Sequence, residues 1–512
     1  APWGADWEAN VTDEKPLPFL SVSTDYVRGH MQEPVYNVTY LGRSYGLASV
    51  TCDIGSEWPV LGVWRRTRRD VEKLDDLGVL FPWPYMNGKA VSMYNQQEPV
   101  GVKWNAPNAT LQHRNRLVHV VRPPERVFAA DFCRDGVRSF SSRVSIFTYG
   151  QGKSRSVWIN GERIDRFPAT AKANDVITLD EGESYVGLIP LPATDLGRDE
   201  QVAIDYAWPR LNLDSYVVNT TSPLPNEDAT WKALQDATAG WVIELGDRGE
   251  HGSFRAFQRH MQRAQLSARW SPEQRVLDVT YAGGGDTLQL GCSTQHYRET
   301  PDERYIRPER MLTEQRVNGQ WPWPDKGIDL DCPLGQLGKA ETLTKGGATL
   351  TTRAGQMALL RTEPISNTYE AVNPFTDPQP LELTTPEGVS VRSEGPMSIA
   401  RVTVQPATNR LWIDYCLPPE GGDPGVLLLQ EAARRGEDAG SGFEVAMSRI
   451  MRSFPDAREA RRVSARTLLV AGMGEQPIVM LNGDRLSAPF DAVREGGTTW
   501  LRIPIVAEPG NQ

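Results

Sequence analysis

The chain has 512 residues and a formal net charge of -10, and hydrophobic residues make up 39% of it beside 45 Gly and 38 Pro. An acidic chain without a dominant basic stripe is a poor partner for nucleic acid, because that binding depends on Lys and Arg neutralising phosphates. No stretch approaches the ~20 apolar residues of a membrane-spanning helix, so we expect no membrane insertion. Frequent Gly, Pro, Thr and Val favour an all-β protein with many turns.

The N-terminal region reads as strands joined by turns. Residues 35–50, VYNVTYLGRSYGLASV, alternate apolar and polar side chains around two glycines, which predicts paired strands. This segment is rich in tyrosine and contains Tyr40 and Tyr45, which are candidate catalytic residues.

Two short segments combine aromatic residues with proline, FPWPY at 81–85 and WPWP at 321–324. The alternating prolines of the first segment exclude a regular helix or a central strand. Such segments can form rigid platforms on which sugar rings stack, or they can plug the open end of a β-sandwich, and the sequence leaves both open. The candidate substrate-binding aromatic residues are Trp83, Tyr85, Trp321 and Trp323.

The segment ATLQHRNRLVHVVRPP at 109–124 reads as one strand with a polar first half. A period of two places His113 and Asn115 on one face, with Arg114 and Arg116 on the other. Unpaired polar groups cost about 1–3 kcal/mol each to bury, so we expect this half to line a wet or ligand-filled cleft. The alternative is that these side chains are hydrogen-bonded structural groups at a sheet edge.

Turn signals mark further strands along the chain. Asn160-Gly161 between apolar residues predicts a hairpin, and a related phrase recurs at 479–486. A glycine turn at 283–285 predicts another strand pair. GWVIEL at 240–245 reads as a buried strand, and apolar spacing predicts a helix over 253–266.

Composition and turn signals divide the chain into four predicted regions. They are an N-terminal antiparallel β-sandwich with a cleft at 1–215, a mixed helix and strand bridge at 216–265, a second β-sheet domain at 266–420, and short helices with a C-terminal β-hairpin module at 421–512. The predicted fold class is all-β, a large supersandwich-like antiparallel β-sandwich followed by a further β-domain, with few short helices.

The polar residues at 109–124, with the tyrosines before them, match the needs of β-elimination on a uronic-acid polymer. The C5 proton can be abstracted only when an Asn, His or Arg offsets the negative charge of the uronate carboxylate. A His or Tyr then takes the proton. A Tyr base needs an adjacent cation, because its ordinary pKa is near ~10. The candidate catalytic residues are His113, Asn115, Tyr40, Tyr45 and Arg114, and Arg116 is a candidate substrate-binding residue.

Other chemistries have weaker support in the sequence. Five widely spaced cysteines with no CxxC pair do not read as a zinc site or a disulfide framework, so we expect no metal and no cofactor. No P-loop, GxSxG or GxGxxG motif lies in a strand–helix setting. Asp329 and Asp331 keep a glycosidase pair open, although their spacing in sequence does not give the separation that the mechanism depends on.

Four segments occur in an order that resembles the β-sheet half of heparinase II/III-like and related alginate-type polysaccharide lyases: YNVTYLGRSYGLAS, TLQHRNRLVHVVRP, VWINGERI and ANDVITLDEGESYVGLIPL. The resemblance covers roughly residues 35–300. It implies a large antiparallel sandwich that cleaves uronate-containing chains by β-elimination, with His113 near the cleft and a tyrosine of the Tyr40–Tyr45 region as acid or base.

The helical α/α-toroid of that family has no counterpart in the chain. The chain is then the sheet half of a longer or processed protein, a lyase with its site wholly on the sheets, or a relative that binds glycans without cleaving them. A helical-toroid partner or a second copy of the chain is an expected partner, beside an acidic polysaccharide or other glycan.

We therefore predict a carbohydrate-active protein, a polysaccharide lyase-like enzyme that cleaves uronate-containing glycans. A non-catalytic glycan-binding or structural β-sandwich protein is the first alternative, and a glycoside hydrolase is the second. We expect a secreted or periplasmic location, with a signal peptide removed before Ala1.

Overall fold

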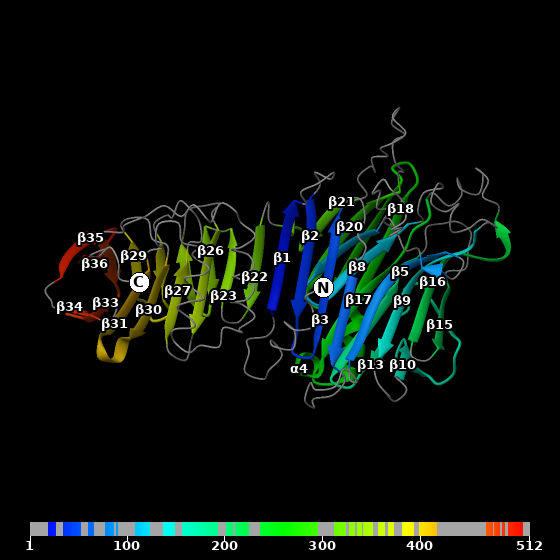
Figure 1. The fold of residues 1–512 in the computed structure, drawn as a ribbon, viewed down its shortest axis with the longest axis horizontal. Coiled ribbons are helices and arrows are strands. Elements are labelled where there is room, and N and C mark those ends of the chain that lie inside the picture. Colours follow the sequence, from blue (N-terminus) through cyan, green and yellow to red (C-terminus); the bar gives the residue numbers. More distant parts are fainter. Residues whose placement is uncertain are drawn as a thin grey trace, which may run out of the picture. The chain divides into compact units, whose positions relative to one another are not determined.

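The computed structural model divides the chain into two compact units, Val22–Lys326 and Ala1–Ser21 with Gly327–Gln512 (Figure 1). The residues that the structure describes are 19–26, 34–52, 60–65, 77–86, 89–90, 108–122, 137–148, 156–192, 201–207, 210–224, 236–294, 312–323, 327–332, 335–339, 341–351, 357–363, 367–372, 381–393, 399–416, 467–474, 476–481, 484–486 and 490–504.

The described residues lie mostly in β-strands, which confirms the predicted all-β, sandwich-like fold class (Figure 1). The helices among them are α4 (Arg248–His251), α5 (Phe254–Arg263) and the 3-10 turn η2 (Pro406–Thr408). Within this part of the chain no helix is long and apolar enough to cross a membrane. The first strand, β1 (Phe19–Tyr26), contains the point at which the two units divide.

The larger unit has three antiparallel sheets. The first has the spatial order β12 (Ala169–Lys172), β15 (Gln201–Ala207), β16 (Arg210–Leu224), β9 (Val137–Thr148), β5 (Leu77–Met86), β4 (Val60–Arg65), β3 (Tyr45–Cys52) and β2 (Pro34–Leu41), with β6 (Lys89–Ala90) on the end of β5. The second has the order β11 (Glu162–Ile164), β10 (Ser156–Ile159), β13 (Ile177–Asp180), β14 (Ser184–Pro190), β17 (Ala239–Asp247), β8 (Arg116–Val121) and β7 (Asn108–His113). The third has the order β18 (Gln265–Ser271), β19 (Val276–Gly283), β20 (Asp286–Ser293) and β21 (Leu312–Val317).

The seven-stranded second sheet is covered on both of its faces. On one side, Thr110 of β7 donates its backbone N–H to Thr51 of β3 at 2.9 Å, and the Trp241 indole of β17 donates to the Ser142 hydroxyl of β9 at 3.0 Å. On the other side lie β20 and α5, whose Met261 packs against Gly187 of β14. Every residue of β8 and β17 is buried as a result. Strands buried on both faces are expected to be nearly continuous apolar runs, so each polar group in them needs a partner.

Within the segment at 109–124, which we predicted to be a single strand, the residues up to Val121 form a hairpin. Its turn is Arg114-Asn115, with Arg114 in the left-handed region at φ 52°. The register pairs His113 with Arg116, so these two side chains lie on the same face of the sheet. The period of two in a single strand had placed them on opposite faces. The expectation of an open cleft is also wrong for most of the polar half, because residues 108–112 and 115–116 are buried.

FPWPY at 81–85 lies within strand β5, although its prolines were expected to exclude a central strand. β5 pairs with β9 along its length, but β4 pairs with it only as far as Leu80. Pro82 and Pro84 lie beyond the last residue of β5 that pairs with β4, and this is the edge-like setting that strand prolines require. Both prolines are buried, and the aromatic residues between them alternate to the other face.

The smaller unit is a second sandwich, antiparallel except for one parallel pair between β31 and β33. Its first sheet contains β22 (Gly327–Cys332), β23 (Gly335–Lys339), β26 (Met357–Glu363), β27 (Thr368–Val372), β30 (Ile399–Gln405), β31 (Arg410–Cys416), β33 (Ile478–Leu481) and β34 (Asp484–Leu486). Its second sheet contains β24 (Thr342–Lys345), β25 (Ala348–Thr351), β28 (Glu382–Thr384), β29 (Ser390–Ser393), β32 (Thr467–Ala471), β36 (Thr498–Pro504) and β35 (Asp491–Glu495). Side chains from both sheets, such as Leu350 and Leu411, form one core.

Several local predictions are confirmed. Asn160 and Gly161 both have positive φ and join β10 to β11, and Gly284 and Gly285 join β19 to β20. The predicted buried strand and the following helix correspond to β17 and α5. The second predicted hairpin corresponds to the pair β33 and β34, whose connecting residues lie outside the described ones. The short helices expected after 421 also lie outside the described residues. The four-region division stays a prediction.

Candidate functional site

A fully buried carboxylate, Glu244 of β17, is the centre of a polar cluster in the larger unit. Its Oε1 lies 2.6 Å from Nε2 of His260 on α5, and its Oε2 accepts a hydrogen bond of 2.8 Å from the Tyr281 hydroxyl on β19. Nη2 of Arg116 on β8 lies 3.5 Å from Oε1. A buried charge is tolerated only when it is paired and hydrogen-bonded, and Glu244 meets both conditions. We call Glu244, His260, Tyr281 and Arg116, together with Asp286, which pairs with Arg116, the Glu244 cluster.

The tight turn between β19 and β20 fixes the position of Arg116. Nη1 of Arg116 donates to the Gly283 carbonyl and lies 3.1 Å from Oδ2 of Asp286. A Cβ atom at Gly284 would overlap the same guanidinium group. On the outer side of Asp286, Nε2 of His113 is 3.8 Å from Oδ2. Opposite charges therefore alternate from Asp286 through Arg116 to Glu244, and a histidine lies at each end.

The electrostatics of the cluster keep Glu244 ionised. Burial by itself raises the pKa of this carboxyl, but the hydrogen bond with His260 and the charge of Arg116 outweigh it, so the pKa is lower than the ordinary value. Burial lowers the pKa of His113, and the charges of Arg114 and Arg116 add to this against the opposing charge of Asp286.

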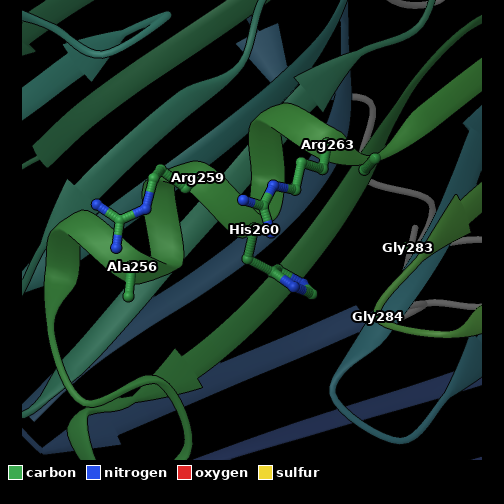
Figure 2. A pocket seen from close by; sticks show the side chains of 7 residues that line it. Ala256, Arg259, His260, Arg263, Gly283 and Gly284 are labelled. Atoms are coloured by element: carbon green, nitrogen blue, oxygen red, sulfur yellow. The ribbon is translucent and has the colours of Figure 1, made fainter.

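A pocket of about 380 Å³ lies beside this cluster, between the last turns of α5 and the β19–β20 turn (Figure 2). Arg259, His260 and Arg263 line it from the helix, and Figure 2 shows the His260 ring directed toward the Gly283-Gly284 backbone. Arg259 and Arg263 are exposed, and neither forms an ion pair with an acidic side chain in the described part of the chain. The pocket thus combines a carboxylate-backed imidazole with two available cations.

A second polar cluster lies at the start of α4. The Tyr45 hydroxyl, which is fully buried, donates to both carboxylate oxygens of Glu250 at 2.7 and 2.9 Å. Asp247, the N-cap of α4, accepts the backbone N–H of Glu250 at 2.9 Å and lies 3.4 Å from the Ser44 hydroxyl. We call Tyr45, Glu250, Asp247 and Ser44, with Tyr40 whose ring centre is 6.1 Å from that of Tyr45, the Tyr45 cluster.

The pKa values in the Tyr45 cluster shift in the direction of the neutral forms. Burial of its carboxylate raises the pKa of Glu250 to about 7, and the nearby charge of Asp247 adds to this, although Glu250 as a whole residue is exposed. Burial and the Glu250 charge raise the pKa of Tyr45 well above its ordinary value and that of Tyr40 to about 12. A tyrosinate base requires the opposite shift.

His251 lies between the two clusters. Its ring centre is 5.0 Å from that of His260, and its edge packs against the backbone of Gly246, next to Asp247. Burial and the neighbouring His260 lower the pKa of His251. The two clusters therefore form one continuous polar region along the C-terminal end of β17 and the following helices.

The structure brings the five predicted catalytic residues to this region. The backbone carbonyl of Asn115 accepts a hydrogen bond of 2.9 Å from the Leu245 backbone N–H. The side-chain amide of Asn115 donates a second one of 2.6 Å to the Leu245 backbone carbonyl. The turn that carries His113, Arg114 and Asn115 is thereby attached to β17 between Glu244 and Asp247. Tyr40 and Tyr45 reach the same end of β17 from β2 and β3. Asn115 is only 7% exposed, so its role there is structural.

The predicted aromatic residues lie apart from the pocket. Trp83 and Tyr85 are half-buried on β5, and the Arg143 guanidinium lies 4.0 Å from the centre of the Tyr85 ring. Trp323 is buried, stacks on Tyr36 at 4.7 Å and donates its indole N–H to Gln315. Trp321 is 54% exposed and lies edge-on to Tyr36.

Sequence reasoning did not identify Glu244, His260 or Tyr281. A signal for the first was present, because GWVIEL was predicted to be a buried strand and a glutamate in such a strand requires a cationic partner. Chain order gives no indication that His260 and Tyr281 supply two of the contacts.

No family model, curated protein or solved structure matches the chain. Within the part of the chain that the structure describes, no group of three or more His, Cys, Asp and Glu side chains is arranged to hold a metal ion.

Proposed function

We propose that the protein acts on an acidic glycan as a polysaccharide lyase-like enzyme, with the pocket beside the Glu244 cluster as its active site. The observation that carries this proposal is the 2.6 Å contact between His260 and the fully buried Glu244 beside two exposed arginines. This is the chemistry that β-elimination of a uronate requires, on different residues from those expected in the sequence.

His260 is the proposed base. Because Nε2 is directed at a carboxylate that stays ionised, the hydrogen of the neutral ring belongs on Nε2, and Nδ1 keeps a lone pair for a proton. A buried carboxylate that orients an imidazole and stabilises its protonated form is the arrangement that makes histidine an effective base. Tyr281 and Arg116 hold Glu244 in place without reaching the pocket.

Arg259 and Arg263 are the proposed carboxylate-binding groups. They lie one helical turn apart on the exposed side of α5, which places their side chains on one face. A guanidinium that pairs with a uronate carboxylate offsets its charge, so that the C5 proton becomes acidic enough for a histidine to abstract. The C4–O4 bond then breaks as the C4–C5 double bond forms, and the protonated His260 returns its proton to the departing O4.

The test is incubation of the full chain with alginate, glucuronan, heparinoids and pectin, and measurement of the ultraviolet absorbance of the C4–C5 unsaturated product. We expect activity on at least one polymer, and a loss of about 10²–10⁴-fold in His260→Ala. Arg259→Ala and Arg263→Ala should raise KM, whereas Arg255→Ala, an exposed arginine of the same helix that does not line the pocket, should not.

Two results would contradict the lyase proposal. Salt-sensitive binding of an acidic polymer without any absorbance change would favour the glycan-binding alternative at the same pocket. New reducing ends without that absorbance would favour a glycoside hydrolase.

A further inference from the structure

Trp321 is the one large hydrophobic side chain that the described residues expose, with 54% of its surface accessible to solvent. A turn at 318–319, with both residues at positive φ, reverses the chain after β21, and two backbone hydrogen bonds pair Gln320 with Val317. The returning segment therefore runs beside β21, which brings Trp321 next to the outward residue Arg316. The exposed ring is held at the edge of the third sheet by this pairing.

Neighbouring rings fix the orientation of Trp321. Tyr36 of β2 meets it edge-on, with 6.1 Å between the ring centres and 83° between the ring planes. Tyr36 also stacks on the buried Trp323 at 4.7 Å, and the Trp323 indole donates to Gln315 of β21. A ring that is fixed before a ligand arrives loses little conformational entropy on binding. Trp321 thus presents a preorganised apolar surface to solvent.

The polar groups beside Trp321 are exposed and are also held in place. The Arg316 guanidinium donates to Glu314 through Nε and to the Gly319 carbonyl through Nη1 at 3.2 Å. The side chains of Arg316 and Glu314 are 48% and 44% accessible. A guanidinium has five N–H donors and a carboxylate accepts about four hydrogen bonds, so these contacts leave both groups able to bind a ligand.

The outward row that contains Arg316 continues across the third sheet. The register pairs Arg316 with Gln289 of β20, Gln289 with Thr280 of β19, and Thr280 with Ser267 of β18. All four side chains are exposed or half-buried, whereas alternate residues such as Leu290 point inward and are buried. Neighbouring strands are about 4.8 Å apart, so the row is a polar track about 14 Å long. We call Trp321, Glu314, Arg316, Gln289, Thr280 and Ser267 the Trp321 platform.

The exposed charges on this face balance. Glu314 neutralises Arg316, and in the adjacent row the exposed Arg269 of β18 is opposite the exposed Asp278 of β19. The platform therefore differs from the pocket beside the Glu244 cluster, which has two exposed cations. An acidic polymer gains no net attraction from a balanced face. The ligand that matches this face has an apolar side for the ring, hydroxyl groups for the polar track, and no net charge.

We propose that the Trp321 platform binds an uncharged stretch of a polysaccharide chain, with Trp321 as its stacking residue. A sugar ring has an apolar side that stacks on an indole, and its hydroxyl groups pair with amide, hydroxyl and guanidinium groups like those of the track. A protein partner would need a larger apolar centre than one ring supplies. The binding does not depend on catalysis at His260, so this proposal and the lyase proposal can fail separately.

The test is affinity electrophoresis of the full chain in gels that contain xylan, galactomannan or laminarin. We expect retardation by at least one of them that persists at 1 M salt, where the Debye length is about 3 Å. Trp321→Ala should weaken the apparent association about tenfold, and Arg316→Ala about threefold. Arg255→Ala, which removes an exposed arginine of α5, should leave it unchanged, as should His260→Ala.

A conservative variant separates binding from folding. Trp321→Phe keeps a stacking ring, so it should retain the retardation that Trp321→Ala loses, and the melting temperatures of both variants should match that of the unmodified chain. Absence of retardation in all three gels, retardation that disappears at 1 M salt, equal weakening in Arg255→Ala, or a concentration-dependent dimer that Trp321→Ala dissociates would overturn the proposal.

Discussion

Glu244 and Glu250 lie at the two ends of one short stretch, and burial acts on both carboxylates with opposite outcomes. Glu244 is fully enclosed, yet the hydrogen bond with His260 and the charge of Arg116 lower its pKa. Burial raises the pKa of Glu250 to about 7 and the charge of Asp247 adds to this, against the two hydrogen bonds from Tyr45. Burial raises the pKa of both carboxyls, and only at Glu244 do cationic and hydrogen-bonding neighbours outweigh it.

The two carboxylates consequently stabilise the fold in different pH ranges. Glu244 contributes stability above its ordinary pKa of 4.5, and this contribution is lost as the pH falls through the lower folded value. Glu250 contributes stability below 4.5 that is lost as the pH rises through about 7.

The largest expected effect comes from neutralising Glu244. Glu244→Gln keeps the shape but leaves Arg116 and His260 around a group without charge, and breaking a buried pair in this way costs about 3–5 kcal/mol. Urea unfolding at pH 7 measures the loss. Glu250→Gln serves as the matched control, and equal stability of the two variants would show that the charge environment does not distinguish the sites.

An intermediate effect is expected at the β19–β20 turn, which positions Arg116. Gly284 and Gly285 have φ values of 61° and 89°, so an alanine is strained at either position, but only the Cβ atom at Gly284 would meet Arg116. Gly284→Ala should lower the free energy of unfolding by about 1–2 kcal/mol more than Gly285→Ala, because it displaces a charged hydrogen-bonded group. If urea unfolding gives the same value for both, the turn does not hold the guanidinium in place.

The smallest effect concerns Glu250 and is seen in its pH dependence. In the unmodified chain, ionisation of Glu250 destabilises the folded state as the pH rises from 4.5 to about 7, and Glu250→Gln removes that penalty. The melting temperature of the variant relative to the unmodified chain should therefore rise across this range. A difference that stays constant between pH 4.5 and pH 8 would contradict the raised pKa.

The parts of the fold that were predictable from the sequence are those with local causes. Asn160-Gly161 and the glycines before Asp286 identify their turns because positive φ favours these residue types. The β7–β8 turn was missed because Arg114 takes positive φ without a glycine. Asn115 holds that turn through two hydrogen bonds to Leu245, a residue far away in the chain.

The candidate site depends on contacts between two sheets and helix α5, which sequence spacing does not encode. Arg116, Glu244 and Asp286 come from β8, β17 and β20. The turn that carries the predicted residues lies beside this cluster, since His113 and Arg116 both approach Asp286. The imidazole that faces the pocket is nevertheless on α5, where the sequence showed a helix with an apolar side and nothing more.

The double hydrogen bond of Asn115 also bears on how the protein ages chemically. Asparagine is a thermolabile residue, and its conversion to aspartate would replace the donor that faces the Leu245 carbonyl with a carboxylate oxygen. Two acceptors would then face each other in a buried setting, which weakens the attachment of the turn to β17. One amide group thus links chemical ageing to the attachment of this turn, and conversion of Asn115, detected by mass spectrometry of heat-aged material, should lower the stability of the folded chain.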